Sequence, residues 1–424
     1  MTRPIKIPGS LGDKDLEGFF RGWNWYDDPE SPVVFNVERG THIAPWAAGL
    51  FGAYALWLKE VRGKEVQLEY DKGSYVGRFL TKVGFTKLFG IEDEVAAVDS
   101  QRIFPLTRIT ESKQIPTIAN AIIAMLEIGD EEVEDALKYS LVELLRNVVQ
   151  HANSRIGGLV CAVYFPKSGL VDVVVIDIGR GVRAALRDSY PEINSDQKAV
   201  RFAMQPHVSG TFHEGMYQSM KDNAGLGLFF IREIASRAYG GFFLGSGSML
   251  ADVWGEQDGT QKKKYIQSST LGWRGTFALL QLRKNAIGEF GALLSLCRDI
   301  AAQVRKDRSE LAVDFVDEKM DLDGLLTVNV KSFEEDVEAA ALVRDQQILP
   351  ALERGDLVVL DFSQVRAATQ SFIHALMYRL FRDGRNLEYC LSVSCADGAT
   401  EEAIRAVSAY ASVEKGGMKN QDPS

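Results

Sequence analysis

Cysteine is scarce in this chain of 424 residues, which has four cysteines and no CxxC spacing among them. This usage indicates a protein whose thiols stay reduced. Positive charge is also in deficit, because 48 lysines and arginines stand against 58 aspartates and glutamates, giving a net charge of −10. That balance argues against electrostatic wrapping of nucleic acid as the default function.

An apolar leader and a membrane-length hydrophobic run are lacking as well. The first residues, MTRPIKIPGSLGDKD, contain no apolar segment that a signal peptidase would recognise. One uncharged run, residues 43–58, has sixteen residues, fewer than the roughly 20 that a membrane span needs. Its early Pro45 and its small residues favour a buried core helix. We therefore expect a cytoplasmic protein without a membrane partner.

The middle third has the pattern of a compact α/β unit. Apolar residues recur on one face of a helix predicted over 131–152. Two β-branched runs, 158–165 and 171–179, are joined by a Pro-Lys-Ser-Gly turn and predict an antiparallel hairpin. The polar segment 183–223 lacks periodicity and predicts a mobile lid. The remaining predicted elements are a helix over 225–241 and a strand over 273–282.

The two ends of the chain share a weak internal pattern. Residues 33–50 and 358–372 each place a polar residue, Asn36 or Asp361, inside an apolar strand that precedes a helix. In both copies the helix ends in a basic turn with glycine before another strand. The pattern predicts that the two copies share one fold.

Four short boxes occur in a fixed order in the middle third: ELLRNVVQHA (143–152), DIGRG (177–181), NAGLGL (223–228) and RGT (274–276). Each box alone is a weak signal. Together, over residues 109–284, they closely resemble the ATP-binding domain of the GHKL superfamily. That superfamily includes gyrase B subunits, heat-shock chaperone ATPases, MutL mismatch-repair proteins, histidine kinases and anti-sigma-factor serine kinases.

The resemblance implies a role for several side chains. Asn147 would be an oxygen ligand of Mg²⁺, a cation that prefers such ligands. Glu143 would be the catalytic carboxylate that orients or deprotonates the nucleophile; a surface ion pair with Arg146 is the alternative. Asp177 would accept a hydrogen bond from the adenine amino group, which would supply the partner that a buried carboxylate needs.

The remaining residues implied in ATP binding act through their backbone or lie near the base. Glycines at 179 and 181 would let the backbone approach the base, or would only form a tight turn. Free N–H groups at the start of a helix favour phosphate. These residues are Gly179, Gly181, Gly225, Leu226, Gly227 and Thr276, the last of which could equally be an ordinary strand threonine.

Two other polar features carry no predicted chemistry. His207 and His213 lie six residues apart without a cysteine or carboxylate pattern around them, so no metal site is expected there. The three lysines at 262–264 form a local basic patch, which we interpret as a solvated loop.

The C-terminal segment 358–372 resembles the STAS fold of anti-anti-sigma factors and, more closely, STAS-like domains found beside such ATPases. The family's phosphoacceptor serine lies ten positions after the polar strand residue, which here is Ser371; a plain helix cap is the alternative, and Thr369 is a poorer candidate. The sequence departs from the family by having Thr-Gln-Ser-Phe where Asp-Ser-Ser-Gly is typical. The N-terminal copy has Pro45–Trp46 there and would be a binding or dimerising module.

The sequence thus predicts an α/β (α+β sandwich) protein: a GHKL Bergerat-type ATP-binding domain (107–285) between STAS-like domains (1–106 and 286–413), with a flexible tail (414–424). It would be a bacterial, partner-switching regulator with serine/threonine-kinase-like activity that binds ATP and Mg²⁺. The alternatives are an ATP-hydrolysing switch that closes a lid and a dimer, and an ATP sensor without turnover. Partners would be proteins recognised through the STAS-like domains, and a homodimer stays open.

Overall fold

The computed structural model describes most of the chain, namely residues 4–92, 102–129, 131–187, 190, 193–205, 227–237, 239–256, 260–284, 313–320, 322–334, 336–365, 368–383, 390–405 and 407–408. The chain divides into two compact units, residues 1–261 with 266–298, and residues 262–265 with 299–424. Both units combine helices with sheets, so the chain has a mixed α/β fold.

The first unit contains a seven-stranded sheet with the order β11-β10-β9-β12-β8-β7-β6. The predicted hairpin is confirmed, because β7 and β8 pair antiparallel and Gly158 lies opposite Asp177. The predicted strand over 273–282 is confirmed as β12. The strands are β6 (Ile103–Ile109), β7 (Gly158–Phe165), β8 (Leu170–Asp177), β9 (Gly241–Gly247), β10 (Met249–Gly255), β11 (Gln261–Gln267) and β12 (Trp273–Arg283).

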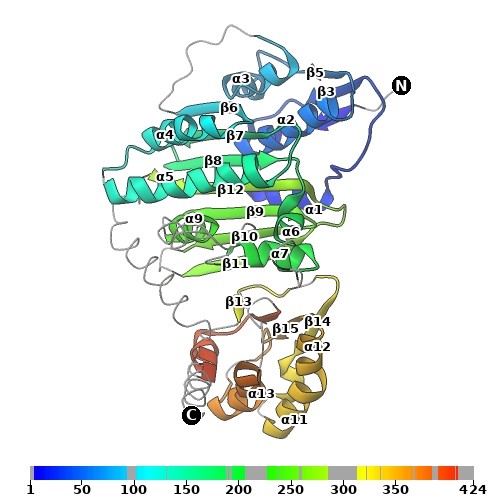
Figure 1. Ribbon diagram of the computed structural model, residues 1–424, viewed down its shortest axis with the longest axis vertical. Helices are drawn as coiled ribbons and strands as arrows, with labels where there is room; N and C mark the ends of the chain where they lie inside the picture. The colour runs from blue at the N-terminus through cyan, green and yellow to red at the C-terminus, as the bar shows by residue number, and fades with distance from the viewer. Residues whose placement is uncertain are drawn as a thin grey trace, which may run out of the picture. The chain divides into compact units, whose positions relative to one another are not determined.

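Helices α4, α5 and α9 pack together beside this sheet (Figure 1). The long predicted helix is confirmed as α5, but its last turn, η4, is a π-helix. The predicted lid, 183–223, contains the end of α6 and the whole of α7, and its residues 188–189, 191–192 and 206–223 lie outside the described residues. The bounds are η3 (Ser112–Gln114), α4 (Ile115–Leu126), α5 (Glu131–Arg146), η4 (Asn147–His151), α6 (Gly181–Leu186), α7 (Asp196–Ala203) and α9 (Gly227–Arg237).

The N-terminal region forms a three-stranded parallel sheet with the order β1-β3-β5 and a two-stranded sheet of β2 and β4. The uncharged run is confirmed as a core helix, α2, in which every residue from 45 to 58 is buried. The elements are β1 (Ile5–Ile7), β2 (Ser10–Leu11), η1 (Asp13–Asp15), α1 (Leu16–Gly22), β3 (Val33–Val37), β4 (His42–Ile43), α2 (Pro45–Glu60), β5 (Val66–Glu69), α3 (Tyr75–Lys82) and η2 (Thr86–Phe89).

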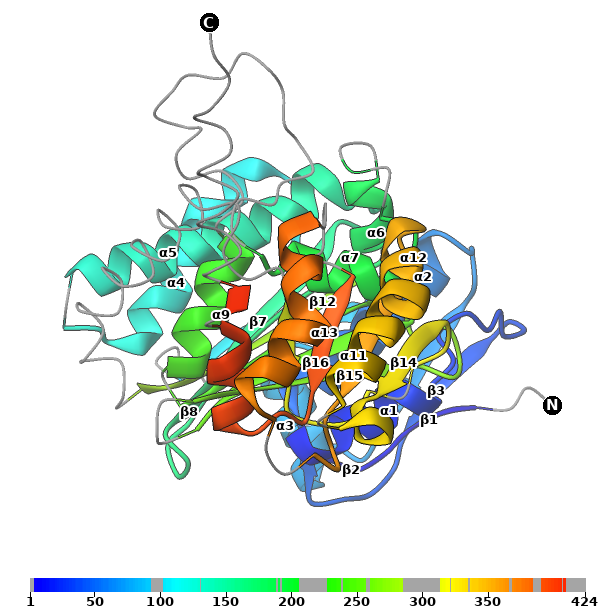
Figure 2. The same cartoon turned by 90° about the horizontal axis from the view of Figure 1, so that it is seen from below.

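Helix α2 packs against β7 and β8 of the seven-stranded sheet. Gly49 of α2 lies over Val174 and Ile176, whereas Val148 of η4 lies over Gly158. Because neighbouring strand residues point to opposite faces, α2 and η4 cover opposite faces of the sheet. Figure 2 shows α4, α5 and α9 grouped together on the side of α5. The boundary expected near residue 106 therefore falls inside one unit, whose apolar side chains from both regions form a shared core.

The second unit has a four-stranded parallel sheet with the order β13-β16-β15-β14. Both copies of the internal pattern form a strand, a helix and a parallel neighbouring strand: β3-α2-β5 in the first unit and β15-α13-β16 in the second. The elements are β13 (Asp314–Val316), β14 (Leu325–Asn329), η6 (Val330–Phe333), α11 (Val337–Val343), η7 (Arg344–Ile348), α12 (Leu349–Glu353), β15 (Leu357–Asp361), α13 (Gln370–Asp383) and β16 (Leu391–Ser394).

Among the described helices, none combines the length and the apolar character that crossing a membrane requires.

Candidate functional site

Asp177 is the last residue of β8, and its side chain is only 2% exposed. Its Oδ1 accepts a hydrogen bond from the Gly179 backbone N–H at 2.7 Å, and the backbone and side chain of Thr276 also donate to the carboxylate. Burial raises the pKa of Asp177 to about 6, and the hydrogen bonds from Gly179 and Thr276 limit the rise. The carboxylate is therefore ionised at pH 7, with neutral groups as its donors.

The turn after Asp177 packs against the end of the first box. The Arg180 backbone N–H donates to the Ala152 carbonyl and its Nε donates to the His151 carbonyl, each at 2.8 Å. A Cβ on Gly179 would lie 2.0 Å from the Ala152 oxygen, so only glycine allows this approach. Gly181 has a φ of +73°, which also favours glycine. The tight-turn interpretation of both glycines has direct support in these contacts.

The first box lies on α5 and on the π-turn that follows it. Glu143 is ion-paired with Arg146, with 2.6 Å between Oε1 and Nη1, which is the alternative contact expected for it. Asn147 begins the π-turn and is partly buried; such turns are frequent at functional sites. Burial and the charge of Arg180 lower the pKa of His151, so its ring is neutral at pH 7.

The fourth box is at the start of β12, where the strand is irregular. Relative to β9, the register shifts between Trp273 and Thr276, and such bulges are common beside functional sites. The indole N–H of Trp273 donates to the Asp177 carbonyl at 2.8 Å. Ser246 of β9 donates to the Gly275 carbonyl at 2.8 Å and accepts from the Val182 N–H at 2.9 Å. The structure thus joins the second and fourth boxes to the end of the first.

The third box is described only in part. Gly225 and Leu226 lie outside the described residues, and Gly227 is the first residue of α9. Helix α9 packs against α5, which carries Glu143. The described part of the predicted helix begins at Gly227.

Metal-ligating side chains do not cluster in the described part of the chain: no group of three or more His, Cys, Asp or Glu residues could hold an ion there. His207 and His213 fall outside that part. Asn147 offers one amide oxygen, which suits a Mg²⁺ ion that takes its other ligands from phosphates and water.

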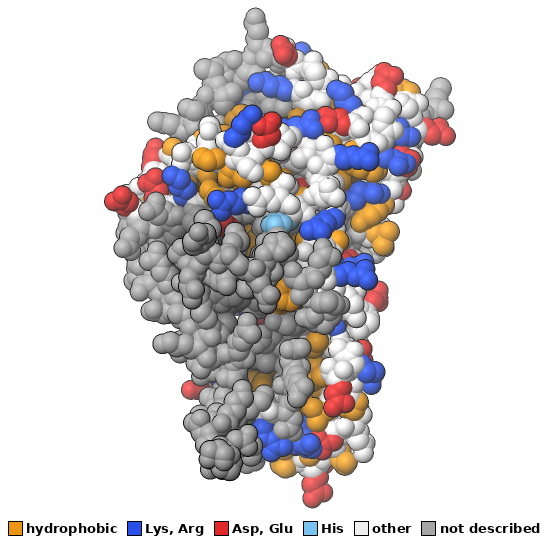
Figure 3. Space-filling model, viewed as in Figure 1, with side chains coloured by type: hydrophobic (Ala, Val, Ile, Leu, Met, Phe, Trp, Pro, Cys, Tyr) orange, Lys and Arg blue, Asp and Glu red, His pale blue; other side chains and the backbone are white. Residues whose placement is uncertain are grey.

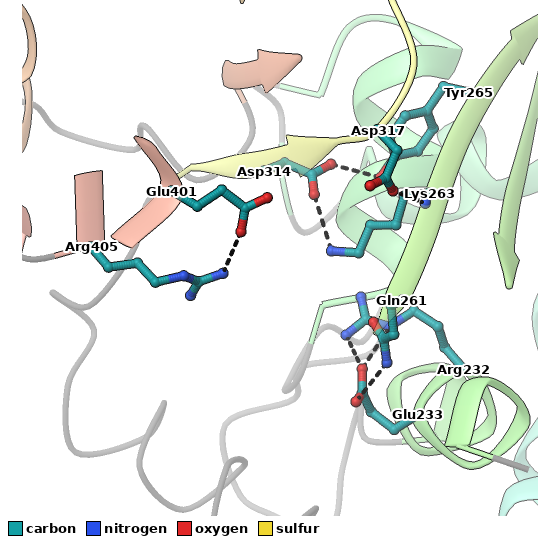
Figure 4. Close-up of polar contacts among 9 residues, drawn as sticks. All are labelled: Arg232, Glu233, Gln261, Lys263, Tyr265, Asp314, Asp317, Glu401 and Arg405. Atoms are coloured by element: carbon teal, nitrogen blue, oxygen red, sulfur yellow. Dashed lines mark hydrogen bonds and ion pairs between the residues drawn. The ribbon is translucent and has the colours of Figure 1, made fainter. Parts of the chain in front are cut away.

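The three consecutive lysines do not form a solvated loop; that interpretation was wrong. They lie in β11, and residues 262–265 group with the second unit. Lys263 Nζ lies 3.3 Å from Asp314 Oδ1, and Lys264 Nζ lies 2.8 Å from Glu318 Oε2; Figure 4 shows the first pair. Acidic partners thus neutralise the charge of Lys263 and Lys264. On the face of the first unit that Figure 3 shows, basic and acidic side chains are interspersed.

Ser371 is the second residue of α13, so the predicted position at a helix start is confirmed. The Thr369 hydroxyl caps this helix by accepting from the Phe372 N–H at 3.4 Å. Thr369 therefore supplies the helix cap that was the alternative role for Ser371.

A cavity of about 580 Å³ in the first unit is lined by Tyr239, Trp254, Gly255, Glu256 and Arg283. None of these residues belongs to the four boxes. Arg283 is engaged with the Tyr239 carbonyl at 3.0 Å, and the cavity adjoins the end of β12 opposite to Thr276. It is separate from the Asp177 site.

Sequence reasoning did not find Ser246 or Trp273 as parts of the Asp177 site, and it gave the box residue Arg274 no role. Ser246 contacts a residue 64 positions away, and no local spacing signals such a pairing. Comparisons with protein-family models, curated proteins and solved structures find no match to this chain. The family resemblance therefore stays a prediction.

Proposed function

We propose that the first unit binds Mg-ATP in a GHKL-type site, and that the chain is a partner-switching regulator with STAS-like regions. The observation that carries the proposal is the buried Asp177 carboxylate, whose donors are all neutral. An ionised buried carboxylate gains from further N–H donors, and the amino group of adenine is such a donor. Three of the four boxes meet around this carboxylate.

The other residues fit the same ligand. Asn147 would hold Mg²⁺, which neutralises phosphate charge, and the helix start at Gly227 would face phosphates with free N–H groups. Gly225 and Leu226 would extend that phosphate contact. Thr276 would position Asp177 through its hydrogen bonds.

The proposed reaction transfers the γ-phosphoryl group of ATP to a serine hydroxyl. Glu143 accepts the hydroxyl proton, the oxygen bonds to the γ-phosphorus, and ADP leaves with the electrons of the broken P–O bond. Ser371 is the proposed acceptor within the chain. Water in place of the hydroxyl would give free phosphate and an ATPase switch.

A nucleotide sensor without turnover is the second candidate, and one contact favours it. Glu143 Oε1 is paired with Arg146 Nη1 at 2.6 Å, so this carboxylate oxygen is already engaged and does not face a nucleophile. Turnover requires that this pair open when nucleotide binds.

The test follows the γ-phosphate. The full chain is incubated with Mg²⁺ and γ-labelled ATP, and both free phosphate and label on the protein are measured. Label that disappears in Ser371→Ala supports the kinase, free phosphate with unlabelled protein supports the ATPase, and neither product despite ATP binding supports the sensor.

The Glu143→Ala variant should bind ATP normally and lose turnover by about 100-fold or more. Glu134→Ala, an exposed glutamate on the same helix, is the matched control and should keep turnover. Turnover at the wild-type rate in Glu143→Ala would show that another group is the base.

A further inference from the structure

Aromatic side chains of the N-terminal region surround the start of β12. The guanidinium carbon of Arg274 lies 4.4 Å from the ring centroid of Tyr26 and 4.5 Å from that of Trp57. Beside it, the rings of Trp25 and Trp273 meet edge to face at 4.8 Å. We call Tyr26, Trp57 and Arg274 the aromatic clamp.

The two rings are the main support of the Arg274 side chain. Its Nε is buried, and no acceptor for it exists among the described residues. A planar guanidinium can stack on an aromatic ring with each of its faces, which lysine cannot do. The clamp therefore holds Arg274 through cation–π contacts with both rings.

Backbone contacts fasten the same N-terminal segment to the turn before β12. Thr270 Oγ1 donates to the Trp23 carbonyl at 2.8 Å. The backbone N–H and the hydroxyl of Ser269 both donate to the Arg21 carbonyl, at 3.2 and 2.6 Å. Residues 21–26 thus contact both the turn before β12, at Ser269 and Thr270, and the start of the strand, at Arg274.

Directly after Arg274, the strand contacts the candidate nucleotide site. A Cβ on Gly275 would lie 2.3 Å from the Asp177 carbonyl oxygen and 2.5 Å from Asp177 Oδ1. The next residue, Thr276, donates to the Asp177 carboxylate. Arg274 and Gly275 lie in the irregular part of the strand, where the ladder does not define their position.

We propose that the aromatic clamp positions Gly275 and Thr276 against Asp177, so that the N-terminal region is an integral part of the nucleotide site. This inference rests on the proposed ATP-binding function. The N-terminal region is then more than a separate binding module, because a partner that displaced residues 21–26 would weaken nucleotide binding. Tyr26, Trp57 and Arg274 are positioning residues, since they act through β12.

The test compares two arginines that stack on the same ring. Arg274→Met removes the clamp from β12, whereas Arg62→Met removes a guanidinium that lies 5.6 Å from the Trp57 ring centroid but belongs to the turn after α2. Affinity for ATP and for adenosine is measured by calorimetry on the full chain from pH 5 to pH 8. Adenosine has no phosphate that titrates in this range.

In Arg274→Met we expect the affinity to fall about tenfold, the lower end of what loss of an outer-shell partner costs. The pH midpoint for adenosine should also rise, because weaker hydrogen bonds from Thr276 stabilise the ionised Asp177 less. Arg62→Met should leave both quantities unchanged. A merely structural role for Arg274 would not move the midpoint.

The outcomes separate the two proposals. If the wild-type chain binds no nucleotide, the proposed function fails and the clamp fails with it. If the wild type binds but Arg274→Met keeps its affinity and midpoint, the clamp alone is overturned. Should Arg274→Met not fold, Arg274→Lys, which keeps the charge and loses the planar guanidinium, is judged by the same two readouts.

Discussion

Each compact unit has a buried aspartate at the end of a strand, Asp177 in β8 and Asp361 in β15, and both side chains are 2% exposed. Each accepts a hydrogen bond from the N–H two residues later, Gly179 at 2.7 Å and Ser363 at 2.9 Å. The pKa values of the two aspartates are nevertheless shifted in opposite directions from the ordinary value. Burial raises that of Asp177 to about 6.

For Asp361, burial also raises the pKa, but hydrogen bonds from Ser363 and the charge of Lys319 outweigh burial and lower it. Lys319 Nζ lies 3.4 Å from Asp361 Oδ2, whereas the donors to Asp177 are neutral. Two aspartates with the same exposed fraction and the same turn thus differ in pKa. Asp177 lies deeper among protein atoms and has only neutral donors, whereas Ser363 and Lys319 stabilise the charge of Asp361. Asp361 is already neutralised by the protein, and Asp177 keeps an anionic oxygen for a ligand.

The strongest test of this comparison replaces each carboxylate by an amide. Asp177→Asn should weaken ATP binding at least about 100-fold, because the adenine amino group then meets a neutral amide whose own N–H₂ competes with it. Asp361→Asn should leave the affinity unchanged. Calorimetry with both variants decides, and equal affinity in Asp177→Asn and wild type would refute the site.

A third buried aspartate extends the comparison to stability. Asp172 accepts from Gln281 Nε2 at 2.9 Å, while Gln281 Oε1 is buried without a donor among the described residues. Burial and the charge of Asp13 raise the pKa of Asp172 to about 8, despite the hydrogen bond from Gln281. A proton on Asp172 would supply the donor that Gln281 Oε1 lacks.

Between pH 5 and pH 7 the folded chain should therefore hold a proton on Asp172 that the unfolded chain has lost. Stability then falls as pH rises, by about 1.4 kcal/mol for each pH unit. Asp172→Asn, which donates without titrating, should remove this slope. Urea unfolding of the wild type and of Asp172→Asn from pH 5 to pH 7 measures this slope. If the free energy of unfolding has the same pH dependence in both proteins, Asp172 is ionised in the folded chain.

The titration of Asp177 gives a smaller effect on binding. Because its pKa is about 6, about one tenth of the carboxylate is ionised at pH 5, so adenosine should bind roughly tenfold more weakly than at pH 7. The affinity of Asp361→Asn should follow the same curve. A flat profile in the wild type would mean that the Asp177 charge does not contribute to recognition.

The smallest effect concerns the cation beside Asp361. Lys319→Met should raise the pKa of Asp361 and lower the free energy of unfolding at pH 7 by less than about 1 kcal/mol, because the lysine is mostly exposed and screened. The loss should shrink at high salt. A large, salt-independent loss would indicate that Lys319 matters through packing.

Elements with strong periodicity were predictable. The core helix α2, the helix α5, the hairpin of β7 and β8 and the strand β12 all lie where their patterns place them. The π-turn at Asn147 and the strand β11 were not predicted. A π-turn does not change the apolar period that precedes it, and three adjacent lysines hide the alternation by which a strand is recognised.

For the site, the sequence by itself determined the residue types, their order and their local turns. It placed an aspartate at the end of an apolar strand, a turn with glycines after that aspartate, and an amphipathic helix earlier in the chain. Only the tertiary structure decided that Thr276 donates to Asp177, that Lys319 pairs with Asp361, and that Tyr26 and Trp57 hold Arg274. Apolar periodicity shows that a face is buried but not what covers it, and the pKa of a buried carboxylate depends on the neighbours that the fold brings to it.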